Sequence, residues 1–143
     1  MKIIQAEKIS DFSKINDFFW EIWKEEFDID IFDRIDEYKK QIVYFIEKDW
    51  IIISAITCNL IDTDSYIRRF ATNKNNRWTW IWTILLNELI ENLKRKWIKK
   101  IFVSSEIKRS NFYEKFSFIK FWIIKNIWNT QVVEMKKDLI AND

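Results

Sequence analysis

A single apolar stripe in the middle of the chain constrains the fold more than any other feature. Residues 66–72 are typical of a strand and residues 73–76 of a polar turn. The apolar residues that follow recur at the three-and-four spacing of a helix with one buried face: Ile81, Leu85, Leu86, Leu89, Ile90 and Leu93. The sequence therefore predicts a strand, a polar loop and a long amphipathic helix within residues 65–97.

The predicted loop has a geometry that suits a phosphate ligand. A strand that leads into a helix points several backbone N–H groups, and the positive end of the helix dipole, at one place. Loops of this kind are usually built from glycine, because the ligand must touch the backbone. This loop instead contains Trp78, Trp80 and Trp82. The element order thus favours phosphate binding, whereas the residues oppose it.

These residues resemble the acetyl-CoA signature of the GNAT superfamily of N-acetyltransferases. The signature is Gln or Arg, two residues, Gly, one residue, and Gly or Ala. Arg77 matches its first position, Trp80 and Trp82 stand at the two glycine positions, and Trp78 stands where a further glycine is common. The resemblance implies main-chain contacts from strand residues to the acetyl and pantetheine groups, and a pyrophosphate cradle from loop residues. The implied acetyl-CoA site is Phe70, Ala71, Thr72, Arg77, Trp78, Thr79, Trp80, Ile81, Trp82 and Thr83.

A second stretch, residues 110–118, is similar to the GNAT pattern Phe-Tyr-Glu-Lys-x-Gly-Phe, with Ser117 in the glycine place. The resemblance implies that Tyr113 is the general acid that protonates the leaving thiolate. A phenol suits this role, since its ordinary pKa lies above that of a thiol. Tyr113 could equally pack a short helix against the sheet. Asp64 or Glu106 could be the general base, although a solvated surface explains both.

Tryptophan occupies several other places that suit glycine. The chain has no glycine and nine tryptophans, whereas an average chain is roughly 7% glycine. Trp50 lies in a predicted hairpin turn, Trp97 follows the long helix, and Trp128 lies in a turn-like break; each is a place where positive φ is common. We hypothesise that UGA codons read as glycine in the source were translated as tryptophan. The alternative is that the tryptophans are genuine.

The remaining pattern predicts one α/β domain, residues 1–143. We expect a mixed, mostly antiparallel sheet of six to seven strands, about four helices and a central parallel strand pair. An acidic stretch at 25–30 is a solvated surface or a place that recruits an amine. The expected strands are 2–6, 41–47, 51–60, 66–72, 100–105, 118–126 and 130–137, and the expected helices include one capped by Ser10 or Asp11 and a shorter one at 31–38.

Composition excludes several functional classes. The net charge of +2 is too small to predict nucleic acid or an anionic membrane as a partner. The longest uncharged run, 50–61, is too short to cross a bilayer. With no histidine and only Cys58, we expect no metal site, no internal disulfide and a cytoplasmic location.

The predicted function is transfer of an acetyl group from acetyl-CoA to a primary amine, with glycine at the loop positions. The acceptor is a small-molecule amine, a protein N-terminus or a lysine, and the protein is a monomer or a homodimer. The alternative is a GNAT-shaped interaction module without catalysis, in which Trp78, Trp80 and Trp82 fill the pyrophosphate loop and forbid its positive-φ residues.

Overall fold

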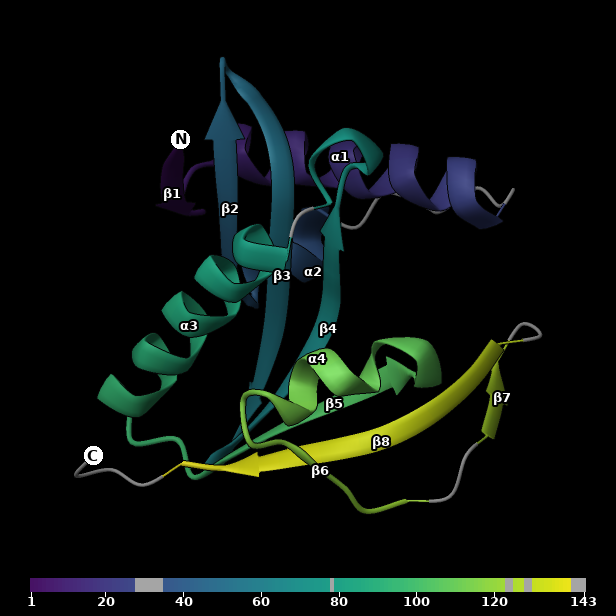
Figure 1. Ribbon diagram of the computed structural model, residues 1–143. Coiled ribbons are helices and arrows are strands. Elements are labelled where there is room, and N and C mark those ends of the chain that lie inside the picture. The colour runs from purple at the N-terminus through teal and green to yellow at the C-terminus, as the bar shows by residue number, and fades with distance from the viewer. Residues whose placement is uncertain (28–34, 78, 123–124, 128–129, 140–143) are drawn as a thin grey trace. The chain divides into compact units, whose positions relative to one another are not determined.

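The computed structural model describes residues 1–27, 35–77, 79–122, 125–127 and 130–139 (Figure 1). Its elements, in chain order, are β1 (Lys2–Gln5), α1 (Ile9–Phe27), α2 (Ile35–Lys39), β2 (Ile42–Lys48), β3 (Ile51–Ile61), β4 (Asp64–Thr72), the 3-10 turn η1 (Lys74–Asn76), α3 (Thr79–Arg95), β5 (Lys100–Glu106), the 3-10 turn η2 (Ile107–Arg109), α4 (Ser110–Glu114), β6 (Ile119–Lys120), β7 (Lys125–Ile127) and β8 (Thr130–Asp138).

The strands form the mixed sheet that the sequence predicts. Hydrogen bonds link them in the order β1-β2-β3-β4-β5-β8-β6, and β7 pairs with β8. The pairs β1–β2, β2–β3 and β5–β8 are antiparallel, whereas β4 and β5 run parallel. A helix connects the two parallel strands, as a parallel crossover requires. The predicted fold class, including the parallel pair, is therefore confirmed.

The chain divides into two compact units. Unit 1 contains Met1–Asn59 and Arg69–Glu91, and unit 2 contains Leu60–Arg68 and Asn92–Asp143. The prediction of one domain stays a prediction. None of the helices in the described part of the chain is both long and apolar enough to cross a bilayer.

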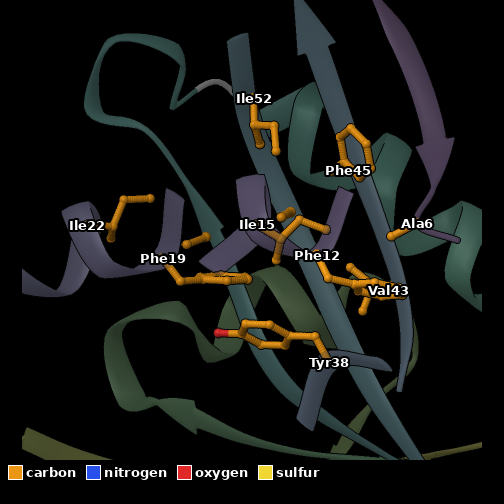
Figure 2. Packing of buried hydrophobic residues seen from close by; sticks show 11 residues of the cluster. Ala6, Phe12, Ile15, Phe19, Ile22, Tyr38, Val43, Phe45 and Ile52 are labelled. Carbon is orange, nitrogen blue, oxygen red and sulfur yellow. The ribbon is translucent and has the colours of Figure 1, made fainter. Parts of the chain in front are cut away.

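The core of unit 1 lies between α1 and the strands β2 and β3. Phe12, Ile15 and Phe19 of α1 are buried against Val43 and Phe45 of β2 (Figure 2). Tyr44 and Ile46 alternate with them and are buried as well, so both faces of β2 are covered. The buried residues of α1 thus recur at the three-and-four spacing of an amphipathic helix.

The predicted cap of α1 differs by a few residues. The helix begins at Ile9, so Asp11 lies in its first turn. There Asp11 Oδ2 accepts hydrogen bonds from the backbone N–H groups of Glu7 and Lys8, each at 3.1 Å. The carboxylate reaches back to the backbone that precedes the helix, as the third helical residue does in a capping box, instead of standing at the cap position. Part of the predicted acidic stretch, and half of the predicted helix at 31–38, lie outside the described residues; α2 contains the described half of that helix.

In unit 2, strand β8 pairs with three other strands. Ile101, Val103, Val133 and Met135 are buried, and α4 lies over β5 and β8 in the view of Figure 1. The expected single strand 118–126 is wrong, because the structure has β6 and β7 instead. Ile119 opposes Lys136 and Lys125 opposes Val132, so seven residues, 119–125, correspond to five on β8, 132–136. The two pairings therefore cannot belong to one continuous ladder.

Five described residues have positive φ. They are Asp49 (53°), Trp50 (68°), Asp62 (55°), Trp97 (61°) and Ser117 (68°). Asp49 and Trp50 form the two-residue turn between Lys48 and Ile51, where positive φ at both positions is the hairpin preference. Trp97 follows α3 and Ser117 follows α4, both at left-handed helix ends. The prediction of positive φ is thus confirmed for Trp50 and Trp97, while Trp128 lies outside the described residues.

Candidate functional site

The loop between β4 and α3 is held by short polar contacts of unit 1. The backbone N–H of Asn73 donates to the Ile53 carbonyl oxygen at 2.9 Å. Asn76 Nδ2 donates to Asn73 Oδ1 at 2.7 Å, which closes the η1 turn. These bonds fix the path of the chain from the end of β4 through η1. The predicted order of strand, polar loop and helix is confirmed.

Arg77 is positioned at the surface of this loop. Its Nε donates to the Thr72 carbonyl oxygen at 3.0 Å, and the residue is exposed. The bond ties the base of the guanidinium to the last residue of β4. A guanidinium anchored in this way presents planar N–H donors of the kind that match a phosphate.

Trp80 and Trp82 lie in the first turn of α3, and neither has positive φ. The expectation that the loop requires positive φ at these two positions is therefore wrong, because the helix has already begun at Thr79. Trp80 is 42% exposed. The Trp82 ring packs against Phe70, with ring centroids 5.5 Å apart. Trp78 lies outside the described residues. Positions 80 and 82 therefore differ from glycine in the size of the side chain and not in backbone conformation, since each carries an indole at a helix N-terminus.

The end of β4 combines buried side chains with a hydrogen-bond partner that the sequence did not reveal. Ala71 and Thr72 are buried and Phe70 is half-buried. The hydroxyl of Ser54 donates to the Ala71 carbonyl oxygen at 3.0 Å, and its oxygen lies 2.7 Å from Thr72 Oγ1. Ser54 is fully buried in β3, so this group fixes the strand end that leads into the loop. Nothing in the sequence marks Ser54 beyond its place in an apolar strand.

The parallel pairing of β4 and β5 is short. Its register runs from Asp64 opposite Lys100 to Ile67 opposite Val103. Phe70 lies three residues past that last pair, and Ala71 and Thr72 follow. The three strand residues that the sequence assigned to acetyl-CoA thus come after the parallel ladder.

Tyr113, in unit 2, is a buried residue of α4. Its ring makes edge-to-face contacts with Phe112 and Phe118, with centroids 5.3 and 5.4 Å away. Burial raises the pKa of the phenol, and the Arg109 guanidinium offsets part of that rise. The phenol therefore keeps its proton at neutral pH. Ser117 has the positive φ that its glycine place predicts, and the Phe118 N–H bonds back to the Tyr113 carbonyl at 3.2 Å.

Glu106, at the end of β5, is less solvated than expected. Its side chain is 22% exposed, and Oε2 lies 3.4 Å from Lys108 Nζ and 4.0 Å from Arg109 Nε. That oxygen is buried and accepts no hydrogen bond from the described residues. Placing Glu106 on a solvated surface was therefore wrong. Asp64, the other candidate base, is half-buried at the start of β4.

Comparison with known proteins gives a match in structure alone. No family model and no curated protein matches the sequence. A putative N-acetyltransferase from Lactobacillus plantarum superposes with a TM-score of 0.85 at 19% identity, over 97% of this chain and 98% of that one. An acetyltransferase of GNAT family from Staphylococcus aureus has a TM-score of 0.78 at 20% identity, over 97% and 99%. An aminoglycoside 6'-N-acetyltransferase complexed with coenzyme A has a TM-score of 0.79 at 14% identity, over 100% of this chain and 99% of that one.

This chain has the GNAT fold. The elements that carry the two sequence matches, β4 to α3 and α4, are formed as the GNAT resemblance predicts. At these identities, the TM-scores establish the fold alone.

Within the GNAT fold of this chain, the structure brings together part of the predicted site. Phe70 contacts Trp82, and Arg77 contacts Thr72, all within unit 1. Tyr113 belongs to unit 2. Arg109 was not predicted as a functional residue from the sequence. Its position could have indicated it, because Arg109 lies three residues after Glu106 and four residues before Tyr113.

Proposed function

We propose that this protein is an N-acetyltransferase that moves an acetyl group from acetyl-CoA directly to a primary amine. The observation that carries the proposal is the junction of β4, its polar loop and α3 in a chain with the GNAT fold. That junction places the N-terminus of a 17-residue helix, whose first N–H groups have no acceptor within the helix itself, two residues after the anchored Arg77.

In the proposed complex, residues of unit 1 bind acetyl-CoA. The main chain of Phe70, Ala71 and Thr72 contacts the acetyl and pantetheine groups, since these residues follow the last parallel pair of β4 and β5. Arg77 and residues 78–83 surround the pyrophosphate. The carbonyl of the thioester accepts a backbone N–H, which stabilises the negative charge that develops on its oxygen during attack.

Tyr113 supplies the proton for the leaving group. When the C–S bond breaks, the electron pair goes to sulfur, and the phenol protonates the thiolate. Because burial raises the pKa of Tyr113, the residue is fully protonated when the reaction begins. The same burial makes the phenolate product costly, so a neighbouring positive charge is needed for the residue to act as an acid.

The proposal includes glycine at the tryptophan positions of the natural loop. Trp50 and Trp97 support it, since both have left-handed backbones that disfavour a β-carbon. Both side chains are also mostly exposed, at 87% and 68%, so little packing explains a large indole there. For Trp80 and Trp82 the argument is steric, because a phosphate approaches a helix N-terminus most closely when no side chain stands over it.

If the tryptophans are genuine, we propose the second function, an interaction module of GNAT shape without catalysis. The observation that favours it is the packing of Trp82 on Phe70, which places an indole beside a strand residue assigned to acetyl-CoA.

Titration calorimetry with acetyl-CoA tests the proposal. The chain as printed is expected to show no binding at ligand concentrations on the order of 1 mM. The triple variant Trp78→Gly, Trp80→Gly, Trp82→Gly is expected to bind. The matched control replaces the same three residues with alanine, which removes the indoles but keeps the β-carbons.

The three possible outcomes of that titration have different consequences for the proposed function. Binding by the glycine variant alone supports glycine in the loop. Equal binding by the alanine variant supports the site but removes the argument for glycine there. Lack of binding by the glycine variant overturns the enzyme proposal. Peptide mass spectrometry of the natural protein across residues 78–82 decides separately which residue the cell inserts.

The acceptor is proposed only as an amine, either a small molecule or a protein N-terminus or lysine. One similar structure is an aminoglycoside acetyltransferase, which makes polycationic amines the first compounds to test. A cytoplasmic location is part of the proposal, since the single cysteine, Cys58, is buried and has no second cysteine with which to form an internal disulfide.

A further inference from the structure

Glu106, Arg109 and Tyr113 follow one another at separations of three and four residues along the turn that links β5 to α4. The 3-10 turn η2 (Ile107–Arg109) leads directly into α4 (Ser110–Glu114), with Arg109 at the junction. Glu106 is the last residue of β5, and its carboxylate forms an ion pair with Arg109. Arg109 immediately precedes α4, in which Tyr113 stands four residues further on, a spacing that places two side chains on one face of a helix. Arg109 therefore lies between a carboxylate and a phenol along this segment.

Arg109 forms an ion pair with Glu106 but leaves Oε2 of its carboxylate without a hydrogen bond from the described residues. Their Nε and Oε2 atoms lie 4.0 Å apart, and the two side chains are 31% and 22% exposed. This is an ion pair without a hydrogen bond, and Oε2 remains a buried oxygen with no donor from the described residues. A buried acceptor that lacks a donor is unfavourable, and an incoming N–H group would relieve it. Lys108 also lies near Oε2, but its side chain is 77% exposed, so water screens its charge.

Arg109 also acts on Tyr113. The phenol is buried between aromatic rings, and the positive charge of Arg109 lowers a pKa that burial raises. A guanidinium stays protonated at any pH used for an enzyme. Its charge therefore favours the phenolate that remains after Tyr113 has given up its proton.

We propose that Arg109 is the positioning residue of the proton-transfer system: it holds Glu106 as the base for the acceptor amine and supports Tyr113 as the acid for the leaving thiolate. This inference rests on the proposed acetyl transfer, and it adds a base and a residue that links base to acid.

The protons and charges balance in this arrangement. The neutral amine attacks the thioester carbon, and one N–H proton passes to Glu106 Oε2. The C–S bond breaks with its electron pair on sulfur, and sulfur takes the proton of Tyr113. The negative charge has then moved from Glu106 to Tyr113, and the positive charge of Arg109 favours it at both places. Transfer of the proton from Glu106 to the phenolate, directly or through water, restores the starting state.

The experiment uses the protein carrying glycine at 78, 80 and 82 as the parent, with acetyl-CoA, an amine panel and thiol release as the readout. Arg109→Gln is expected to lower kcat about tenfold or more, a fraction of the 10²- to 10⁴-fold effect of acid–base groups. Its affinity for acetyl-CoA, measured by calorimetry, should stay within about twofold of the parent. Arg109→Lys keeps the charge and is expected to retain most of kcat. The matched control is Lys108→Gln, which removes the exposed cation beside the same carboxylate and is expected to leave kcat unchanged.

A mutant cycle separates a positioning role from a structural one. In a parent that also carries Glu106→Gln and Tyr113→Phe, Arg109→Gln is expected to cost less than about threefold, since the groups it serves are gone. The same tenfold loss in that background would overturn the inference, as would equal losses for Arg109→Lys and Arg109→Gln. A parent that binds acetyl-CoA but releases no thiol with any amine would instead overturn the proposed function, and this inference with it.

Discussion

Replacing Trp50 or Trp97 by glycine and by alanine, in separate variants, tests whether these backbones suit glycine. Both replacements remove the indole, so the difference between them isolates the β-carbon at φ values of 68° and 61°. Whatever stability the indole provides is missing from both variants and cancels in that difference. The comparison is therefore insensitive to how well each tryptophan packs.

The magnitude follows from two opposing effects. A β-carbon in the left-handed region costs roughly 1 to 2 kcal/mol. Glycine itself lowers stability by about 0.4 to 1 kcal/mol relative to alanine, because it increases the conformational entropy of the unfolded chain. The glycine variant should thus have a free energy of unfolding about 1 kcal/mol higher than that of the alanine variant at each position. For a chain of this size, that corresponds to roughly 3 °C in Tm.

Trp20 provides the matched control, since it lies in the middle of α1 (Ile9–Phe27). There glycine should be less stable than alanine by about 1 kcal/mol, because a helical backbone penalises glycine. Urea denaturation followed by circular dichroism measures all six variants. If alanine equals or exceeds glycine at Trp50 and Trp97, the left-handed conformation is not what limits these sites, and the structural support for glycine is lost.

Two further predictions concern a buried phenol and a buried hydroxyl. Burial raises the pKa of Tyr113 above its ordinary 10.0, so above pH 10 the unfolded chain releases a proton that the folded chain keeps. The free energy of unfolding should then fall by up to about 1.4 kcal/mol per pH unit more steeply than in Tyr113→Phe. The pKa of Lys137 is lowered by burial and by Lys94, so Lys137 makes stability rise with pH, but it does so equally in the parent protein and in Tyr113→Phe. If the urea midpoints of these two proteins run parallel above pH 10, the prediction is refuted. Ser54→Ala should cost about 1 to 3 kcal/mol, since it removes the buried hydrogen bonds that Ser54 makes with the Ala71 carbonyl oxygen and the Thr72 hydroxyl. Ser104→Ala, at an exposed hydroxyl, should change stability by less than about 0.5 kcal/mol. Equal effects in denaturant titrations would contradict the assigned burial.

Much of the fold was predictable because apolar periodicity is local. The stripe that includes Ile81, Leu85 and Leu89 defines α3 and its buried face, and all three residues are buried. The turn at Asp49 and Trp50 follows from its length and its place between two strands. Failures came where pairing partners decide the outcome. The division of 118–126 into β6 and β7 depends on a mismatch with β8, which no pattern within those residues reveals.

The candidate site divides in the same way. The sequence by itself determined the element order at the loop, the place of Arg77 after β4 and the glycine-like character of Trp50, Trp97 and Ser117, since each depends on backbone geometry over a few residues. Only the tertiary structure decided that α3 has already begun at Trp80, that Ser54 holds the end of β4, and that Glu106 is partly buried beside Arg109. Ser54 is distant in sequence from the end of β4, and the burial of Glu106 depends on the depth at which its side chain lies, so local pattern reveals neither. The spacing of three between Glu106 and Arg109 is local and could have been read from the sequence.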